Sequence, residues 1–337
     1  MTEPSPRFLI VRLGSLGDVI HAIPAAAALR TRHPGARIDW LVDPRYRELL
    51  QLVEGLDHAI PIDPRGGVSA LLRTVLELRR TKYDAVVDLQ GLLKSGVLAR
   101  AAGARRTIGL PREHLREAVA RVFYSETPDP GCDPHVIHKN LALMRALDVD
   151  EPRVSFPLKT PRTVTGDTVA ARFGPEGYAV INPGAAWPNK RWPPDRFGAL
   201  AAEIRARIGM RSLVLWGPGE EDIASLVIGA SRGAAELSPR TSIVDLFAIA
   251  RRAKLMVSGD TGPLHIAAAV GTPIVALFGP TLAERNGPWA RADIKLSRAA
   301  RCFCHYERRC RLLQPCIDDI AVDEVVSAAE YRVAARG

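Results

Sequence analysis

The 337-residue sequence has no long hydrophobic run, because its apolar segments are short and broken by glycine, proline or charged residues. A helix that spans a bilayer needs about 20 consecutive apolar residues, so this absence argues against a membrane-spanning segment. Residues 1–7 are polar and lack the hydrophobic region of a secretory signal peptide. We therefore expect a cytoplasmic protein.

Aromatic residues are also scarce, at 6% of the sequence, although the net charge is +9. Such a charge favours an anionic partner: nucleic acid, anionic lipid or a phosphorylated glycan. Basic residues gather between positions 94 and 121, but the aromatic residues that nucleic-acid-binding modules place among them are missing there. We expect an acidic lipid or sugar phosphate as partner, and no nucleic acid.

Cysteine is rare, with five residues, and four of them lie close together near the end of the sequence: Cys302, Cys304, Cys310 and Cys316. In a cytoplasmic protein such a group is more typical of a metal site or of reduced thiols than of disulfides. The spacing C-x-C-x5-C-x5-C lacks the C-x2-C pairs of common zinc sites. We expect no metal and no cofactor, with a metal-bound cluster as the less favoured alternative.

The dinucleotide-binding pattern G-x-G-x-x-G is absent after the first predicted strand, which argues against a nicotinamide-dependent dehydrogenase. The turn there reads Leu13-Gly14-Ser15-Leu16-Gly17-Asp18 and places a carboxylate where the next helix begins. Asp18 could simply cap that helix. Alternatively it is catalytic, because open α/β sheets carry their chemistry at the carboxyl ends of strands.

What the sequence does contain is a repeated alternation of strands and helices, which predicts parallel sheets covered on both faces. In the first half we expect strands at 7–12, 38–42, 58–62, 85–89 and 107–109, and helices at 19–31, 44–53, 67–81, 92–102, 113–123 and 135–147. In the second half we expect strands at 178–182, 212–216, 255–257 and 274–278, and helices at 194–208, 220–229, 244–253, 263–270 and 322–335.

The stretch between the two alternations is rich in proline, threonine and charged residues, which is typical of a connection between domains. We predict an N-terminal domain at 1–157, a linker at 158–176, a C-terminal domain at 177–321, and a final helix at 322–337 that packs back on the N-terminal domain.

The strongest phosphate-binding pattern lies between residues 256 and 281. A strand leads into a turn with Gly259, Thr261 and Gly262, Pro263 is suited to the first helical position, and His265 lies about one turn further on. This unit presents backbone N–H groups and the positive end of a helix to an anion. It also occurs in doubly wound folds without a phosphate, where His265 would be an ordinary helix residue.

Two further loops follow strands in the second half. Residues 182–193 contain Lys190, a point charge suited to a diphosphate, and residues 215–220 end at Glu220, which can accept hydrogen bonds from sugar hydroxyls. Each residue alone could be a solvated surface charge. Three such loops at one sheet edge favour a binding site.

Four motifs in order resemble family 9 glycosyltransferases, the ADP-heptose:lipopolysaccharide heptosyltransferases, over nearly the whole chain. They are L-G-S-L-G-D-V-I-H-A-I-P from Leu13, D-L-Q-G-L-L-K-S from Asp88, N-P-G-A-A-W-P-N-K-R-W-P from Asn182 and G-D-T-G-P-L-H-I-A-A-A-V-G-T-P from Gly259. The first domain looks closest to heptosyltransferase I. The resemblance implies a GT-B fold, two doubly wound Rossmann-like domains facing a cleft, and inverting transfer without a metal.

By position, the resemblance implies that Asp18 is the general base and that Lys190 stabilises the departing ADP. It implies a donor site formed by Ser15, Gly17, Asn182, Gly184, Ala185, Ala186, Glu220, Asp260, Thr261, Gly262 and His265. The basic residues Arg65, Lys94, Arg116 and Lys139 match positions near the acidic acceptor. The partners implied are ADP-heptose, a Kdo-lipid A type acceptor and the anionic cytoplasmic face of the inner membrane, to which the protein would bind peripherally.

One departure concerns Ala185 and Ala186, where heptosyltransferase I often has hydroxyl residues. The cysteine-rich stretch is more frequent in the enzymes that add the second heptose. Heptosyltransferase II, or another family 9 transferase acting on a different core sugar, is therefore the alternative. Outside this class, the alternatives are a sugar-nucleotide epimerase and a non-enzymatic, metal-binding adaptor.

Overall fold

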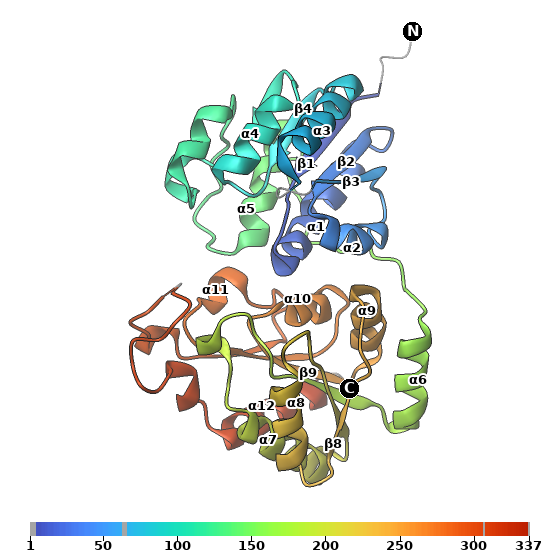
Figure 1. Ribbon diagram of the computed structural model, residues 1–337, viewed down its shortest axis with the longest axis vertical. Helices are drawn as coiled ribbons and strands as arrows, with labels where there is room; N and C mark the ends of the chain where they lie inside the picture. Colours follow the sequence, from blue (N-terminus) through green and yellow to red (C-terminus); the bar gives the residue numbers. More distant parts are fainter. Residues whose placement is uncertain (1–4, 63–65, 306, 336–337) are drawn as a thin grey trace. The chain divides into compact units, whose positions relative to one another are not determined.

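The computed structural model describes residues 5–62, 66–305 and 307–335. The chain divides into two compact units, unit 1 (Met1–Lys159) and unit 2 (Thr160–Gly337). Each unit is built on a parallel β-sheet with helices packed against it (Figure 1). Within the described residues, no helix is both long and apolar enough to cross a bilayer. The predicted α/β architecture with parallel sheets is confirmed.

Unit 1 has a five-stranded sheet in the order β3-β2-β1-β4-β5, and all its strand pairs are parallel. Its strands are β1 (Arg7–Val11), β2 (Arg37–Val42), β3 (His58–Pro61), β4 (Ala85–Asp88) and β5 (Arg106–Ile108). Its helices are α1 (Leu16–Arg32), α2 (Arg47–Gln51), α3 (Gly67–Thr81), α4 (Leu93–Ala101) and α5 (Val136–Leu143), with 3-10 turns η1 (Pro44–Tyr46), η2 (Arg112–His114), η3 (Ala118–Phe123) and η4 (Met144–Leu147).

The strand order of unit 1 reverses between β1 and β4, which pair in register from Phe8 with Ala85 to Val11 with Asp88. The chain leaves β1 towards β2 on one side, while β4 continues to β5 on the other. In open parallel sheets the loops at such a reversal diverge and leave room for a ligand. The loops after Val11 and Asp88 are therefore where unit 1 is expected to carry its chemistry.

Unit 2 has a six-stranded sheet in the order β11-β10-β9-β6-β7-β8, again with parallel pairs throughout. Its strands are β6 (Tyr178–Asn182), β7 (Arg211–Val214), β8 (Ala235–Leu237), β9 (Leu255–Gly259), β10 (Ile274–Phe278) and β11 (Ile294–Ser297). Its helices are α6 (Val164–Phe173), α7 (Pro194–Ile208), α8 (Glu221–Ala230), α9 (Ile243–Arg252), α10 (Gly262–Ala269), α11 (Ala283–Asn286) and α12 (Val322–Ala334), with 3-10 turns η5 (Gly174–Glu176), η6 (Pro188–Lys190), η7 (Ala299–Arg301) and η8 (Cys316–Asp319).

The order of this second sheet reverses between β6 and β9, where Asn182 pairs with Ser258. The loop that contains Lys190 follows β6, and the loop before α10 follows β9. Because the two strands are neighbours and parallel, both loops leave the same edge of the sheet side by side. This register brings together two motifs about 80 residues apart in the sequence.

The segment 113–123, predicted as one helix, forms the two short 3-10 turns η2 and η3 instead. Between them the backbone is extended at Leu115. The carboxylate of Glu117 accepts a hydrogen bond from Leu93 N at 2.7 Å, and a side chain at Gly91 would touch Leu115. These contacts with the start of α4 hold the segment in an irregular path.

The predicted linker contains a helix, α6, which belongs to unit 2. Thr163 caps it by accepting a hydrogen bond from Gly166 N at 3.0 Å. Asp167 pairs with Arg252 of α9 at 2.5 Å, and the absent side chain of Gly166 lets α6 approach Ala248. The prediction missed this helix because the surrounding stretch is rich in proline, threonine and charged residues and has no long periodic pattern.

The last helix, α12, was predicted to pack on the N-terminal domain. In the structure it packs in unit 2. Val325, Val326 and Ala329 are buried in the same core cluster as residues of α7 and β10. Arg332 pairs with buried Asp293 at 3.0 Å. The apolar face of α12 is therefore satisfied within the C-terminal core.

Candidate functional site

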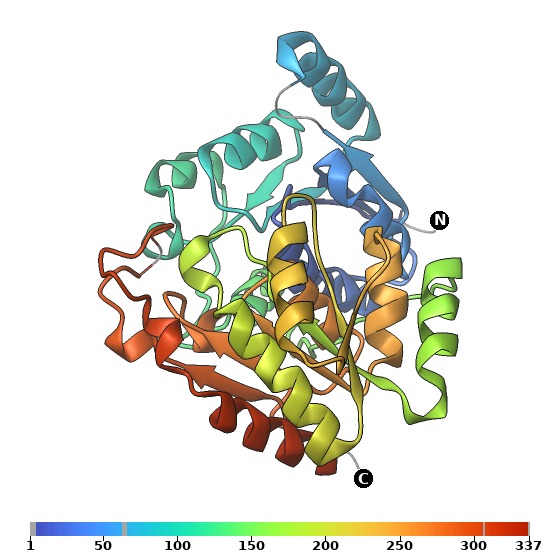
Figure 2. The same cartoon turned by 60° about the horizontal axis from the view of Figure 1, so that its bottom comes forward.

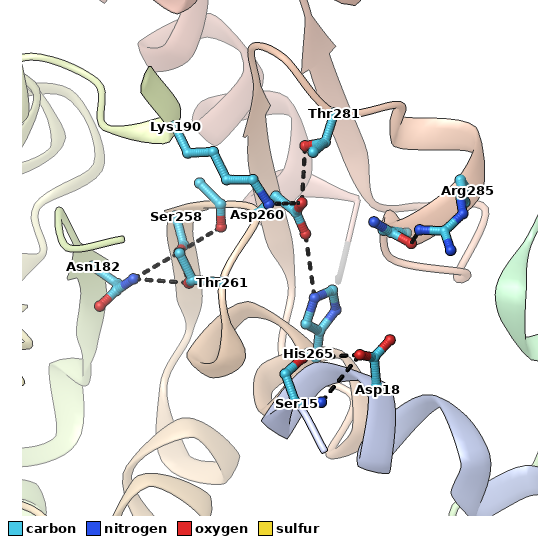
Figure 3. A network of polar contacts seen from close by, with 12 residues as sticks. Ser15, Asp18, Asn182, Lys190, Ser258, Asp260, Thr261, His265, Thr281 and Arg285 are labelled. Atoms are coloured by element: carbon cyan, nitrogen blue, oxygen red, sulfur yellow. Dashed lines mark hydrogen bonds and ion pairs between the residues drawn. The ribbon is translucent and has the colours of Figure 1, made fainter. Parts of the chain in front are cut away.

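A buried asparagine joins the two loops at the edge of the unit 2 sheet (Figure 3). Asn182 Nδ2 lies 3.0 Å from Ser258 Oγ and 3.0 Å from Thr261 Oγ1, and it is 3.2 Å from Gly184 O. Asn182 ends β6 and Ser258 lies near the end of β9. These hydrogen bonds fix the entrance to α10 relative to the loop that follows β6.

Helix α10 begins at Gly262, and the side chain of Thr261, the residue before it, does not cap it. The Thr261 hydroxyl is instead held by Asn182 and by Ser258 Oγ at 3.1 Å. Backbone N–H groups in the first turn of a helix lack partners within the helix and lie at the positive end of its dipole. The start of α10 therefore has the features that attract a phosphate.

A buried carboxylate, Asp260, lies between these loops and contacts three side chains (Figure 3). Lys190 Nζ lies 2.6 Å from Asp260 Oδ2, and Thr281 Oγ1 donates to the same oxygen at 2.8 Å. His265 Nε2 lies 3.4 Å from Oδ1. The side chain of Asp260 is only 5% exposed and that of Lys190 is 15% exposed, so water screens this ion pair weakly.

The surroundings of Asp260 keep it ionised. Burial alone would raise the pKa of this carboxyl, but the hydrogen bond from His265 and the positive charge of Lys190 outweigh it, and the pKa lies well below its usual range. A permanently negative Asp260 in turn holds the Lys190 ammonium in one position.

Two contacts place the Lys190 ammonium next to the start of α10. Its Nζ lies 4.6 Å from the centre of the Trp187 ring, a favourable cation–π arrangement. A Cβ at Gly259 would lie only 2.9 Å from Lys190 O, so a side chain at this position would force the two loops apart. A fixed cation and an uncapped helix N-terminus together suit a diphosphate group.

Glu220 precedes α8 and lies against the loop after β6. Its Oε2 accepts a hydrogen bond from Gly217 N at 2.9 Å. A Cβ at Gly184 would lie 2.1 Å from that oxygen, so glycine is needed there for Glu220 to keep its position. The next residues, Ala185 and Ala186, are buried and exposed respectively. The structure thus brings Asn182, Gly184 and Glu220 together, as predicted for one site.

Asp18 lies in the first turn of α1, after β1 of unit 1 (Figure 3). Its Oδ2 accepts hydrogen bonds from Ser15 N and Ser15 Oγ, both at 3.1 Å, so it does cap the helix. Its Oδ1 pairs with Arg12 Nη2 at 2.6 Å. The side chain of Asp18 is 35% exposed, whereas that of Arg12 is 8% exposed. Ser15 and Gly17 belong to this turn of unit 1, while the other predicted donor residues belong to unit 2.

Arg12 is a residue that the sequence analysis missed. Its guanidinium also donates to the carbonyl oxygen of Leu89, just after β4. Leu13 N donates to Gln90 Oε1 at 2.7 Å, which joins the same two loops. The sequence did offer one indication of this role, because Arg12 is a charged residue directly at the end of a buried strand. Arg12 and Gln90 together fix the turn that carries Asp18.

The D-L-Q-G motif also supplies a structural carboxylate. Asp88 is fully buried and accepts hydrogen bonds from Gln90 N, Gly91 N, Ser95 Oγ and Tyr124 Oη at 2.7 to 3.2 Å. Burial raises its pKa, although these hydrogen bonds act in the opposite direction. Asp88 thus fixes the loop after β4 against α4 and Tyr124.

The predicted acceptor-binding residues lie on separate elements of unit 1. Lys94 is exposed on α4, Arg116 is exposed between η2 and η3, and Lys139 is half-buried on α5. Arg65 lies outside the described residues. These positions remain predictions.

The four clustered cysteines are reduced and pack against one another. The sulfur of Cys304 lies 3.6 Å from those of Cys302 and Cys310. Burial, with the neighbouring Cys302, raises the pKa of the Cys316 thiol to about 12. Over the described part of the chain, no group of three or more His, Cys, Asp or Glu side chains is arranged to hold a metal ion. The geometry is that of reduced thiols packed against one another.

Comparison with known proteins identifies the family of this chain. Residues 71–315 match the model of glycosyltransferase family 9 (heptosyltransferase). Lipopolysaccharide heptosyltransferase 1 of Pseudomonas aeruginosa is 30% identical over 325 residues, covering 93% of this chain and 89% of the relative. The enzyme of the same name from Escherichia coli K12 is 26% identical over 290 residues, covering 82% and 88%.

The fold is likewise that of solved heptosyltransferases. The structure of E. coli heptosyltransferase WaaC with ADP superposes with a TM-score of 0.78 at 23% identity, covering 97% of this chain and 99% of that one. This likeness confirms the predicted GT-B fold. With the family model matching most of the sequence, the chain belongs to glycosyltransferase family 9, the heptosyltransferases.

Proposed function

We propose that this protein transfers heptose from ADP-heptose to a Kdo-containing acceptor of the lipopolysaccharide inner core, as the first-heptose enzyme. The observation that carries this proposal is the Lys190–Asp260 pair beside the uncapped start of α10, a place suited to the diphosphate of a nucleotide sugar. The P. aeruginosa and E. coli relatives named lipopolysaccharide heptosyltransferase 1 support the choice of donor and acceptor.

In this proposal, Asp18 removes the proton from the acceptor hydroxyl as that oxygen attacks the anomeric carbon of the donor. A single base opposite the leaving group is sufficient for a direct displacement, which inverts the anomeric configuration. Asp18 is partly exposed and its carboxylate is oriented by Arg12 and Ser15. It is therefore accessible and held in place, as a general base needs to be.

Negative charge develops on the departing ADP during this step and needs stabilisation. Lys190 supplies a fixed positive charge, and the N–H groups of Thr261 and Gly262 add the positive end of α10. Asp260 and His265 act through Lys190, because both oxygens of Asp260 already contact protein side chains. This arrangement provides positive charge without a metal ion.

The remaining donor contacts follow from the loops around β6. Asn182, Gly184, Ala185 and Ala186 line the path towards Glu220, which would accept hydrogen bonds from the nucleotide or the sugar. With alanines at 185 and 186, backbone N–H groups would contact the diphosphate where hydroxyl groups do so in other members. Ser15 and Gly17, in the turn that carries Asp18, complete the set of proposed donor-binding residues.

The acceptor would be held by Arg65, Lys94, Arg116 and Lys139, whose positive charges match Kdo carboxylates and lipid phosphates. Such an acceptor is embedded in the cytoplasmic face of the inner membrane. We therefore propose that the protein binds that surface peripherally, through electrostatic attraction.

Two variants test the assignment of roles. Asp18→Asn should bind ADP-heptose as the wild type does but lose about 100-fold or more in single-turnover rate, because it removes only the base. Lys190→Ala should weaken donor binding and slow the reaction, because in this proposal Lys190 contacts the diphosphate both in the bound donor and in the transition state. An Asp18→Asn protein with a near-normal rate would refute the proposed base.

A further inference from the structure

Helix α3 of unit 1 is amphipathic but barely buried. Of its 15 residues only Leu78 is buried. Its apolar residues nevertheless recur with helical spacing, at Val68, Leu71, Leu72, Val75 and Leu76. Figure 2 shows α3 at the periphery of unit 1. The helix therefore carries more apolar surface than its packing uses.

The inward and outward parts of this apolar surface can be separated. Val75 and Leu78 pack against the core cluster of unit 1. Leu72 is 56% exposed, Leu76 is 57% exposed and Val68 is 71% exposed. At about 100° per residue, these three side chains lie on one flank of α3, beside the strip that faces the sheet. They form a contiguous apolar flank and are not isolated exposed residues.

Basic residues border this flank. Arg73 and Arg80 are both exposed and lie two turns apart on the strip next to Leu76. Arg79 is used within the protein, since its Nε donates to Ala101 O at 2.9 Å. An apolar strip edged by arginine is typical of helices that lie in the interface of an anionic membrane.

The elements beside α3 carry the same combination of residues. Helix α4, which contacts both α3 and η3, exposes Leu93 and Val97 next to Lys94. Turn η3 exposes Val119 and Val122 and carries Arg121. The large exposed apolar side chains of unit 1 thus lie on elements that also carry basic residues. A protein partner would need acidic groups placed to match these residues, whereas an anionic lipid surface supplies negative charge everywhere.

We propose that the flank of α3 formed by Val68, Leu72 and Leu76, with Arg73 and Arg80, docks unit 1 on an anionic lipid bilayer. The leucines enter the interface and the arginines contact the headgroups. This rests on the peripheral membrane association proposed above and names the surface responsible for it. It would place the acceptor-binding unit next to a lipid-linked acceptor.

Cosedimentation with vesicles tests this docking. The full-length protein should bind vesicles of phosphatidylcholine with phosphatidylglycerol and should bind phosphatidylcholine alone weakly. Leu72→Glu/Leu76→Glu should lower the partition coefficient at least about tenfold. Arg73→Gln/Arg80→Gln should lower it by about fivefold for each charge removed. Equal binding of the leucine pair variant and the wild type would overturn the proposal.

Leu226→Glu is the matched control, because Leu226 is 60% exposed on α8, a helix of unit 2 that begins with Glu221 and Asp222. It should bind vesicles as the wild type does. Equal loss of binding in this control would overturn the assignment to α3. Analytical ultracentrifugation without lipid addresses self-association: a leucine pair variant that dissociates a wild-type oligomer would make this flank a contact between copies and refute lipid docking.

The docking and the proposed function can fail separately. With a water-soluble, deacylated acceptor, the α3 variants should transfer heptose at the wild-type rate, which also shows that they are folded. A wild-type protein that binds anionic vesicles through α3 but transfers no heptose would refute the proposed function alone. Normal transfer together with vesicle binding that ignores the α3 variants would refute the docking alone.

Discussion

Replacing Lys190 with methionine removes the cation from Asp260, a carboxylate with a side chain only 5% exposed. Removing one partner of a buried ion pair typically destabilises a protein by about 3–5 kcal/mol, because the other charge remains buried without compensation. Asp260 would retain Thr281 and His265 as partners. We therefore expect Lys190→Met to lower the free energy of unfolding by about 3 kcal/mol, near the lower limit of this range. Lys190→Met/Asp260→Asn should recover part of it, giving a coupling energy of about 2 kcal/mol.

Urea unfolding followed by tryptophan fluorescence measures these differences, because four of the five tryptophans lie in unit 2. Arg207→Met is the matched control. Arg207 pairs with Glu203, Asp323 and Glu330, and because all four side chains are at least 40% exposed, the loss of these pairs should cost below about 1 kcal/mol. A coupling energy near zero between Lys190 and Asp260 would refute the view that the carboxylate holds the lysine.

The same pair predicts a pH dependence. The pKa of Asp260 is lower in the folded protein than the value of about 3.9 in an unfolded chain. The unfolded state therefore binds more protons in acid, so the contribution of Asp260 is fully present above pH 4 and declines as the pH falls below it. Asp260→Asn should remove this part of the slope between about pH 4 and 2, measured by the same unfolding experiment.

Three further predictions concern other parts of the protein. Gly184→Ala should push the Glu220 carboxylate away from its place and raise KM for ADP-heptose about tenfold, with little loss of stability because the displaced atoms end a flexible side chain; an unchanged KM would argue against Glu220 as a donor ligand. Arg12→Met should lower kcat and Arg12→Lys should partly restore it, since the cation orients the base; equal activity of both with the wild type would show that the ion pair is dispensable. Exposed Cys132 should react with iodoacetamide in the native protein, whereas buried Cys316, whose pKa is raised to about 12, should react only after unfolding. Equal rates of modification of the two cysteines, measured by mass spectrometry, would contradict the packing of the clustered thiols.

Much of the fold could be predicted from periodicity. The bounds of α3 and α7 and of strands β6 and β10 agree with the structure to the residue, because uninterrupted apolar patterns end there at glycine, proline or polar residues. The 3-10 turns η2 and η3 were not predictable, because contacts with α4 decide their path. Helix α6 was missed because it is short and lies in a stretch rich in proline, threonine and charged residues, and its contacts with α9 join segments that are far apart in the sequence.

The site was predictable as a set of loops, but the relations within it were not. Lys190 and the turn before α10 were singled out because strand, glycine-rich loop and helix follow one another. The ion pair between Lys190 and Asp260 depends on β6 and β9 being neighbours, a pairing that a single sequence does not specify. For the same reason Arg12 was missed: its role depends on Asp18, six residues later, and on Leu89, which follows the neighbouring strand β4.

The most direct test of the proposed activity is ADP release from ADP-heptose by the purified protein, with and without Kdo2-lipid A, in the presence of EDTA. The proposed mechanism predicts release that depends on the acceptor and is unaffected by EDTA, with one heptose added to the lipid by mass spectrometry. ADP binding without release in the presence of Kdo2-lipid A would contradict the first-heptose role, and transfer only to an already heptosylated core would assign the protein to a later step.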